Sequence, residues 1–240
     1  MRPNNRQIDE MRQVEMQVAY NKYAEGSCLI TIGDTVVLCT ASIEDRVPFF
    51  LKNTGKGWIT TEYSMLPRAT GTRTQREISK GKPDGRTQEI QRFIGRALRS
   101  AIDLSKLGER QVMIDCDVLQ ADGGTRTASI TGGYVALCEA IKYMMRNKIL
   151  KNSPIISQIA AVSCGIVGGK VVLDLEYTED SVADVDTNFV LNGNNQIIEI
   201  QGTAEHRAFT EEQLIQMLYV AKIGINSLLK KQREVLKISI

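Results

Sequence analysis

A glycine-rich corner is the first segment of the sequence with the residue types for chemistry. It reads ADGGTRTAS over residues 121–129. It lies between a run that alternates like a strand, Val112–Leu119, and a run with helical apolar spacing, Ile130–Met145. The backbone N–H groups of such a turn, together with the positive end of the helix that follows, favour an anion. The spacing therefore predicts an anion site where the strand ends and the helix begins.

The side chains of this corner favour phosphate in particular. Gly124 permits close approach to the backbone, Thr125 adds a hydroxyl donor, and the guanidinium of Arg126 matches two phosphate oxygens at once. A second Gly-Arg-Thr triplet places Arg86 before another helical run, so both arginines would reach one anion if the two helix starts converge. The sequence contains neither GxxxxGK[ST] nor GxGxxG, which excludes the two common nucleotide-binding loops. The alternative is structural: the glycines make a tight turn, and Arg126 pairs with Asp122 or another acid.

Carboxylates gather in a second segment, YTEDSVADVDTN. They are Glu179, Asp180, Asp184 and Asp186. Asp184 and Asp186 share a face if the chain is extended there, and Asp180 can fold back to join them. Carboxylates without histidine suit Mg²⁺ or Mn²⁺. The single histidine of the chain, His206, excludes a site with several histidines. The alternative is an acidic loop that faces solvent.

A basic zone runs from Pro67 to Ser100. It holds nine basic and three acidic residues, a local charge of +6, so the rest of the chain carries −4 of the total of +2. Its first part, with Arg68, Arg73 and Arg76 among glycines and threonines, has no apolar periodicity and is predicted to be a long loop. Such a zone on an otherwise acidic chain indicates a polyanion partner, and the alternative is a solvated loop and helix face. A phosphate corner, an acid cluster and a basic loop are together the parts that an enzyme acting on phosphodiesters needs.

The elements that would position these residues alternate between strands and helices in both halves of the chain. The predicted strands are Ser27–Ile32, Thr35–Ser42, Ile59–Tyr63, Val112–Leu119, Ala160–Val167, Lys170–Tyr177, Asn188–Leu191 and Gln196–Gly202, and the predicted helices begin at Thr87, Ile130 and Thr210. Thr210 with Gln213 forms a capping box. The pattern predicts an α/β (α+β) fold with mixed sheets and two related halves. No linker separates the halves, so residues 1–240 are expected to form a single domain.

Composition narrows the class of protein further. The chain has 240 residues, of which 42% are apolar and 24% charged, and no apolar run long enough to span a bilayer. Its first residues are charged and lack the apolar core of a signal peptide, so a cytoplasmic protein without membrane contact is expected. Five cysteines stand apart among apolar or small neighbours and are expected to be reduced core residues rather than zinc ligands.

Long segments of the chain carry a specific family resemblance. They are MRPNNR, EGSCLITIGDTVVLCTASIEDRVPFFL, GWITTEYSMLPRATGTRTQRE, GRTQEIQRFIGRALR, DCDVLQADGGTRTASITGGYVAL, EDSVADVDTNFVL and EIQGTAEHRAFT. In them the sequence resembles the ribonuclease PH family of phosphate-dependent 3′-to-5′ exoribonucleases. The resemblance implies that inorganic phosphate attacks the last phosphodiester of RNA, above all in precursor tRNA, and releases nucleoside 5′-diphosphates. It also implies a homo-hexamer of three dimers.

The same resemblance implies roles for particular residues. Positions matching Arg86, Gly124, Thr125 and Arg126 bind phosphate, those matching Asp180 and Asp186 bind Mg²⁺ (or Mn²⁺) or assist proton transfer, and those matching Arg68, Arg73 and Arg76 contact RNA. Two alternatives stay open: a non-catalytic RNA-binding ring subunit of the same family, and a hydrolytic nuclease that uses water in place of phosphate.

Overall fold

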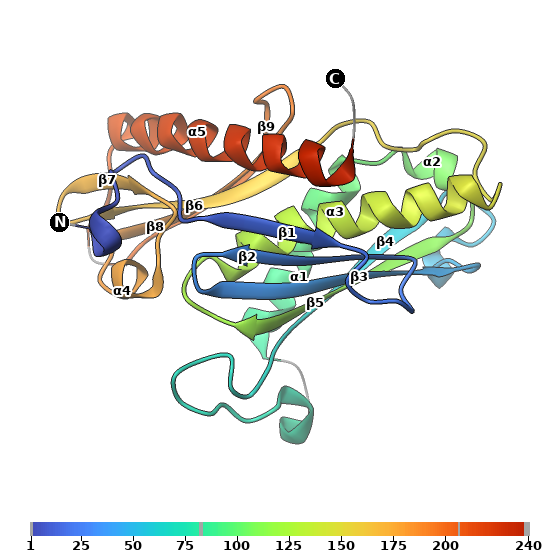
Figure 1. Ribbon diagram of the computed structural model, residues 1–240, viewed down its shortest axis with the longest axis horizontal. Coiled ribbons are helices and arrows are strands. Elements are labelled where there is room, and N and C mark those ends of the chain that lie inside the picture. Colours follow the sequence, from blue (N-terminus) through green and yellow to red (C-terminus); the bar gives the residue numbers. More distant parts are fainter. Residues whose placement is uncertain (1, 82–83, 206, 238–240) are drawn as a thin grey trace.

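The N-terminal half forms a five-stranded sheet in the order β1-β2-β3-β5-β4 (Figure 1). The computed structural model describes residues 2–81, 84–205 and 207–237. Lys82 of the basic zone and the single histidine, His206, therefore lie outside the described residues. The strands are β1 (Val14–Val18), β2 (Gly26–Ile32), β3 (Thr35–Glu44), β4 (Trp58–Met65) and β5 (Gln111–Gln120). The β2–β3 hairpin turns at Gly33, which has a φ of 56°, as the sequence predicts. Strand β4 pairs with β5 in parallel, and the other neighbours are antiparallel.

Two long helices pack on this sheet, and both begin before the apolar spacing does. Helix α1 spans Gly85–Ser100 instead of beginning at Thr87, and α3 spans Thr125–Arg146 instead of beginning at Ile130. The spacing marks only the buried turns, whereas the first turn of each helix is polar and partly open. Arg86 and Arg126 are therefore each the second residue of a helix, in the first turn, instead of lying in a loop before it. A short helix α2 (Leu104–Leu107) follows α1.

The C-terminal half forms an antiparallel four-stranded sheet in the order β7-β6-β8-β9. Its strands are β6 (Ile159–Val167), β7 (Lys170–Leu173), β8 (Val185–Asn192) and β9 (Ile197–Ala204). The prediction that β7 reaches Tyr177 is wrong, because Asp174 adopts a φ of 55° and turns the chain out of the sheet. Tyr177 instead begins the short helix α4 (Tyr177–Asp180), which carries Asp180 at its end.

Helix α3 lies between the two sheets and α5 (Glu211–Leu236) covers the second one (Figure 1). The capping box predicted at Thr210 and Gln213 is present. Because α3 packs on β2 and β3 on one side and on β6 on the other, its residues from Thr127 to Cys138 are all buried. All five cysteines are buried and free, as predicted. The mixed α/β class with two sheets is therefore confirmed.

Short 3₁₀ turns complete the structure: Pro3–Asn5, Phe49–Leu51 and Glu77–Lys80. The last of these belongs to the loop between β4 and α1, which extends away from the body in Figure 1. Within the described part of the chain, no helix is both long and apolar enough to cross a membrane.

Candidate active site

One cavity gathers the predicted phosphate and acid residues. It has a volume of about 200 Å³ and lies where the first turns of α1 and α3 meet α4 and β8. Its walls include Arg86, Gly124, Thr125, Arg126, Asp180 and Asp186. Larger hollows of about 520 and 890 Å³ surround the N-terminal segment, but they lack this set of groups. The two helix starts therefore converge, and each half of the chain supplies part of the cavity.

The glycine corner lies directly before the first turn of α3. Gly123 and Gly124 have φ values of 76° and 67°, in the left-handed region that favours glycine. A Cβ atom on Gly123 would lie 2.5 Å from the carbonyl oxygen of Leu175, so only glycine allows the corner to approach the second half this closely. Gly124 is the residue before the first turn of α3. It has no side chain that could accept a hydrogen bond from the N–H groups of that turn. The N–H groups of this first turn are therefore available to an anion.

The guanidinium of Arg126 is free enough to bind an oxyanion. Its Nη1 atom lies 3.8 Å from Oε1 of Glu89, too far for a hydrogen bond, and the Glu89 side chain is 55% exposed. Asp122, the alternative partner considered from the sequence, instead forms an ion pair with Arg12. Arg86 is exposed at the start of α1. Among the described residues, the ion pair of Arg126 with Glu89 is long, and the charge of Arg126 also acts on Asp180 and Asp186 in the cavity.

Tyr63 is a site residue that the sequence analysis missed. Its hydroxyl lies 2.8 Å from Oγ1 of Thr125, and the ring is buried. Burial raises the pKa of Tyr63, so the phenol stays neutral and can donate its proton to Thr125. Thr125 would then keep its own proton for an anion in the cavity. The inward position of Tyr63 in the alternating strand β4 was the signal available in the sequence.

The four clustered carboxylates separate in the structure. Glu179 is buried and pairs with Arg2 at 2.6 Å and with Arg6 at 3.0 Å, so it faces away from the cavity. Asp184 precedes β8 and is not among the cavity residues. Asp180 and Asp186 do line the cavity. The predicted cluster of four is therefore a pair.

The pKa values of the two cavity aspartates, Asp180 and Asp186, are both raised. Burial, followed by the nearby charge of Asp180, raises the pKa of Asp186 to about 6. Burial of its carboxylate also raises the pKa of Asp180, an effect that the charges of Arg126 and Arg86 oppose. Among the described residues, no group of three or more His, Cys, Asp or Glu side chains is arranged to hold a metal ion. A cation here would need its remaining ligands from water or substrate.

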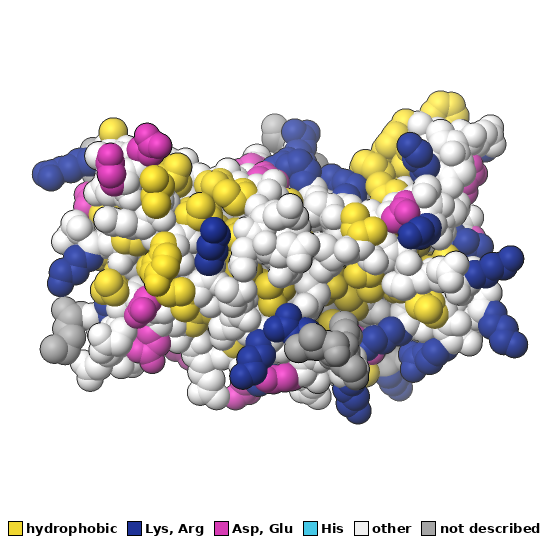
Figure 2. Space-filling model, turned by 90° about the horizontal axis from the view of Figure 1, so that it is seen from above, with side chains coloured by type: hydrophobic (Ala, Val, Ile, Leu, Met, Phe, Trp, Pro, Cys, Tyr) yellow, Lys and Arg dark blue, Asp and Glu magenta, His cyan; other side chains and the backbone are white. Residues whose placement is uncertain are grey.

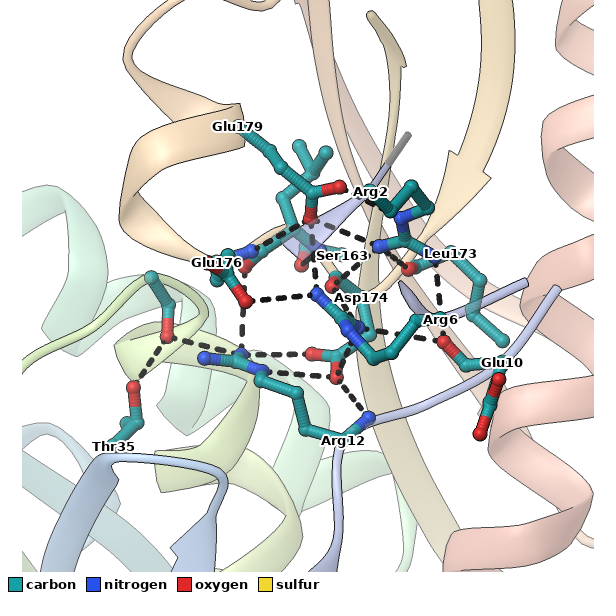
Figure 3. Close-up of polar contacts among 12 residues, drawn as sticks. Arg2, Arg6, Glu10, Arg12, Thr35, Ser163, Leu173, Asp174, Glu176 and Glu179 are labelled. Carbon is teal, nitrogen blue, oxygen red and sulfur yellow. Dashed lines mark hydrogen bonds and ion pairs between the residues drawn. The ribbon is translucent and has the colours of Figure 1, made fainter. Parts of the chain in front are cut away.

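The N-terminal arginines contact the segment that leads into α4 (Figure 3). Arg2, Arg6 and Arg12 form buried ion pairs with Asp174, Glu176 and Glu179, which lie in the segment before and within α4. From the sequence, this charged N-terminal segment indicated the absence of a signal peptide and, through MRPNNR, the family resemblance, but no contact with the second half. Its partners lie more than 100 residues away, so neither spacing nor composition could reveal them.

The basic loop is placed beside the cavity and not inside it. Arg68, Arg73 and Arg76 are exposed and are not among the residues that line the cavity. The base of the loop is fixed, since Ala121 N–H donates to the carbonyl oxygen of Ala69 at 2.8 Å, and Thr70 reaches the cavity wall. The three arginines therefore extend the positive surface outward from the site.

Comparison with known proteins decides the family. The model for the 3′ exoribonuclease family, domain 1, matches residues 10–142, and the model for domain 2 of the same family matches residues 157–224. The chain belongs to the 3′ exoribonuclease family. Ribonuclease PH of Methylobacterium radiotolerans is 55% identical over 98% of this chain and 99% of its own length, and that of Methylorubrum populi is 56% identical over the same shares.

Solved structures share the fold of this chain. An Archaeoglobus fulgidus exosome structure with RNA bound to the active site matches with a TM-score of 0.83 and 26% identity, over 96% of this chain and 92% of the other. Rice Rrp46 matches with a TM-score of 0.78 and 19% identity, over 98% of this chain and all of the other. The present 3′ exoribonuclease is a tRNA nucleotidyltransferase. It processes tRNA precursors from the 3′ end by phosphorolysis.

Proposed function

We propose that the cavity between the two halves binds the attacking phosphate at one end and the scissile phosphodiester at the other. The observation that carries this proposal is that the glycine corner, two arginines and two aspartates line one cavity of about 200 Å³. Arg126, Arg86 and the N–H groups after Gly124 hold inorganic phosphate, with the Thr125 hydroxyl as a further donor. Because both halves supply residues, residues 1–240 act as one catalytic unit.

The reaction needs the phosphate to be oriented and a proton to be moved. An oxygen of the bound phosphate forms a bond to the terminal phosphorus while the bond to the 3′ oxygen of the preceding nucleotide breaks, which yields a nucleoside 5′-diphosphate. The leaving 3′ oxygen takes up a proton. A carboxyl group of the Asp180–Asp186 pair, which lines the cavity, is suited to supply it. Arg126 and Arg86 keep the attacking oxygens facing the phosphodiester.

The aspartate pair fits Mg²⁺ (or Mn²⁺). These ions are held in proteins by one or two carboxylates together with water and substrate phosphate, and two mutually repelling carboxylates are what Asp180 and Asp186 offer. When bound, the ion would offset negative charge on the reacting phosphates.

The products of RNA degradation test this function against its alternatives. With phosphate present, the protein should shorten a 5′-labelled RNA from its 3′ end one nucleotide at a time and release nucleoside diphosphates; without phosphate it should be inactive. Monophosphates released without phosphate would indicate a hydrolytic nuclease. RNA binding without degradation would indicate a non-catalytic ring subunit.

Replacing Asp186 by asparagine should stabilise the metal-free protein at neutral pH. Folding raises the pKa of this carboxyl from 3.8 to about 6, chiefly by burial, so the folded state disfavours the charged form. The penalty is absent below the unfolded pKa, grows as the pH rises to 6 and is complete above it. Asparagine should therefore raise the free energy of unfolding by up to about 3 kcal/mol at pH 7.5 and by little near pH 4. Thermal unfolding in EDTA at both pH values measures the difference, and an equal gain at both would contradict it.

We propose that Arg68, Arg73 and Arg76 contact the RNA backbone. Their loop leaves the cavity wall at Thr70 and extends into solvent, where the three exposed arginines have little apolar surface beside them. Alanine at all three positions should lower the slope of log K against log salt by about 2, since each contact with a single strand contributes about 0.7.

A salt titration and light scattering on one preparation of this triple variant check the prediction. A hexamer with a reduced slope supports RNA contact. A dimer with an unchanged slope would make the loop an assembly element, and a hexamer with an unchanged slope would refute both roles.

We also propose that the chain assembles as a homo-hexamer of three dimers. Figure 2 shows hydrophobic side chains gathered on the face that α5 covers. On that helix Ile215, Tyr219 and Ile223 are 59%, 68% and 37% exposed, and their spacing of four places them on one side. Such a stripe supports burial against another copy, and light scattering of the native protein tests it.

A further inference from the structure

Arg12 joins the phosphate corner to the segment that carries Asp180. It precedes β1, its side chain is only 5% exposed, and its guanidinium lies between the two halves of the chain (Figure 3). Neither the sequence motifs nor the cavity lining includes it. Its contacts on each side define what it can do.

Toward the first half, Arg12 holds the backbone of the glycine corner. Its Nη1 atom donates a short hydrogen bond to the carbonyl oxygen of Asp122 and lies 3.4 Å from Oδ2 of the same residue. Its Nη2 atom lies 3.4 Å from the carbonyl oxygen of Gly123, which also accepts a hydrogen bond from Oγ1 of Thr35 at 2.7 Å. A Cβ atom on Gly124 would be 3.4 Å from Nη2. The guanidinium thus packs directly behind the turn whose N–H groups face the cavity.

Toward the second half, Arg12 holds the start of the acid-bearing segment. Nε and Nη2 donate to the two carboxylate oxygens of Asp174 at 3.0 and 2.8 Å, and the backbone N–H of Arg12 donates to the same carboxylate at 2.8 Å. Asp174 is the residue with positive φ that turns the chain from β7 toward α4. The N–H of Tyr177, the first residue of α4, donates to Oδ1 of Asp122 at 3.3 Å. The guanidinium of Arg12, together with the carboxylate of Asp174, therefore connects the two walls of the cavity.

We propose that Arg12 is a positioning residue that fixes the separation between the phosphate-binding corner and the Asp180 carboxylate. Its planar guanidinium serves both sides at once, which a lysine cannot do. Loss of Arg12 leaves every cavity residue present but loosens their spacing, and phosphorolysis needs the attacking phosphate and the phosphodiester within bonding reach. The inference rests on the roles proposed above for Arg126 and Asp180.

Arg6 offers a matched control for the loss of a buried arginine. Its side chain is 6% exposed and pairs with Glu176 at 3.2 Å, with Glu179 at 3.0 Å and, at 3.6 Å, with Asp174. Within the described residues, its hydrogen bonds reach only the N-terminal segment and residues 174–179, and none reaches the glycine corner. Arg6→Met removes buried ion pairs of one wall, including the 3.6 Å contact with Asp174, but leaves the hydrogen bonds that Arg12 donates to Asp174 and Asp122 in place.

The test compares steady-state kinetics and thermal unfolding of Arg12→Met, Arg12→Lys and Arg6→Met. All three variants should unfold at lower temperature. Arg12→Met should raise the KM for phosphate and lower kcat by about tenfold or more each, because a misplaced turn affects both binding and attack. Arg12→Lys, which keeps the charge but not the fork, should fold and show the same two changes to a smaller extent. Arg6→Met should change both constants by less than about threefold.

Several outcomes would overturn the inference. If Arg12→Lys and any folded Arg12→Met have the wild-type kcat and phosphate KM, Arg12 only stabilises the fold. If Arg6→Met shows kinetic losses equal to those of the Arg12 variants, the effect belongs to the whole network of buried ion pairs. Arg126→Ala, measured in parallel, separates this inference from the proposed phosphate site. A normal phosphate KM in Arg126→Ala would refute the site itself, whereas a raised KM there with normal Arg12 variants would refute only the positioning role.

Discussion

Replacing Arg126 by alanine should raise the KM for phosphate about tenfold to a hundredfold while RNA affinity changes little. The residue stands in the first turn of α3 on the cavity wall, and its one ion pair within the described residues, with Glu89, is long at 3.8 Å. A charged hydrogen bond of this kind contributes about 1.5–3 kcal/mol, which sets the expected range. Phosphorolysis rates at varied phosphate concentration, with a fluorescence assay of RNA binding, measure the two quantities separately.

Arg96 supplies the control for this substitution. It is an exposed arginine of α1 that pairs with Glu199 and does not line the cavity. Arg96→Ala removes the same charge and should leave the phosphate KM near the wild-type value. If Arg126→Ala behaves like Arg96→Ala, the glycine corner is only a structural turn.

Asparagine at Asp180 or Asp186 should nearly abolish turnover and leave RNA affinity close to normal. Both carboxylates line the cavity, and their proposed work is on the metal ion and the leaving oxygen rather than on the bound chain. Loss of proton transfer alone costs about 10²–10⁴-fold, so kcat should fall by at least about a hundredfold. Single-turnover degradation with saturating RNA and phosphate measures the chemical step directly.

Asp184 is the matched control, since it belongs to the same acidic segment but not to the cavity lining. Asp184→Asn should keep its rate and its dependence on divalent metal. Normal rates in both Asp180→Asn and Asp186→Asn would mean that the acidic segment serves only as a solvated surface.

Local signals predicted most of the fold. The β2–β3 hairpin at Gly33 and the capping box at Thr210 depend on residues close together in the chain, so they could be recognised from spacing alone. The starts of α1 and α3 were predicted too late because a polar first turn contains no apolar residues whose spacing could reveal it. The end of β7 was missed because the turn at Asp174 is held by Arg12, a tertiary contact.

The site divides in the same way. Gly124, Thr125 and Arg126 form a local motif, and their joint presence with Arg86 and the two aspartates in one cavity follows the arrangement that their residue types suggested. Glu179 was grouped with Asp180 because they are adjacent, yet the first helical turn of α4 points them to different neighbours, the N-terminal arginines and the cavity. Arg12 acts through residues far away in the chain, and no local pattern marks it. The alternation of β4 marks Tyr63 as an inward residue but does not reveal its contact with Thr125.

Anomalous diffraction from crystals grown with Mn²⁺ and tungstate, a heavy analogue of phosphate, tests the central claim most directly. The account predicts a tungsten peak at the first turn of α3, contacted by Arg126, Arg86 and the backbone after Gly124. It also predicts a manganese peak at Asp180 and Asp186 in the same cavity. Tungstate bound elsewhere, with the corner between Arg86 and Arg126 empty and manganese away from the aspartates, would contradict it.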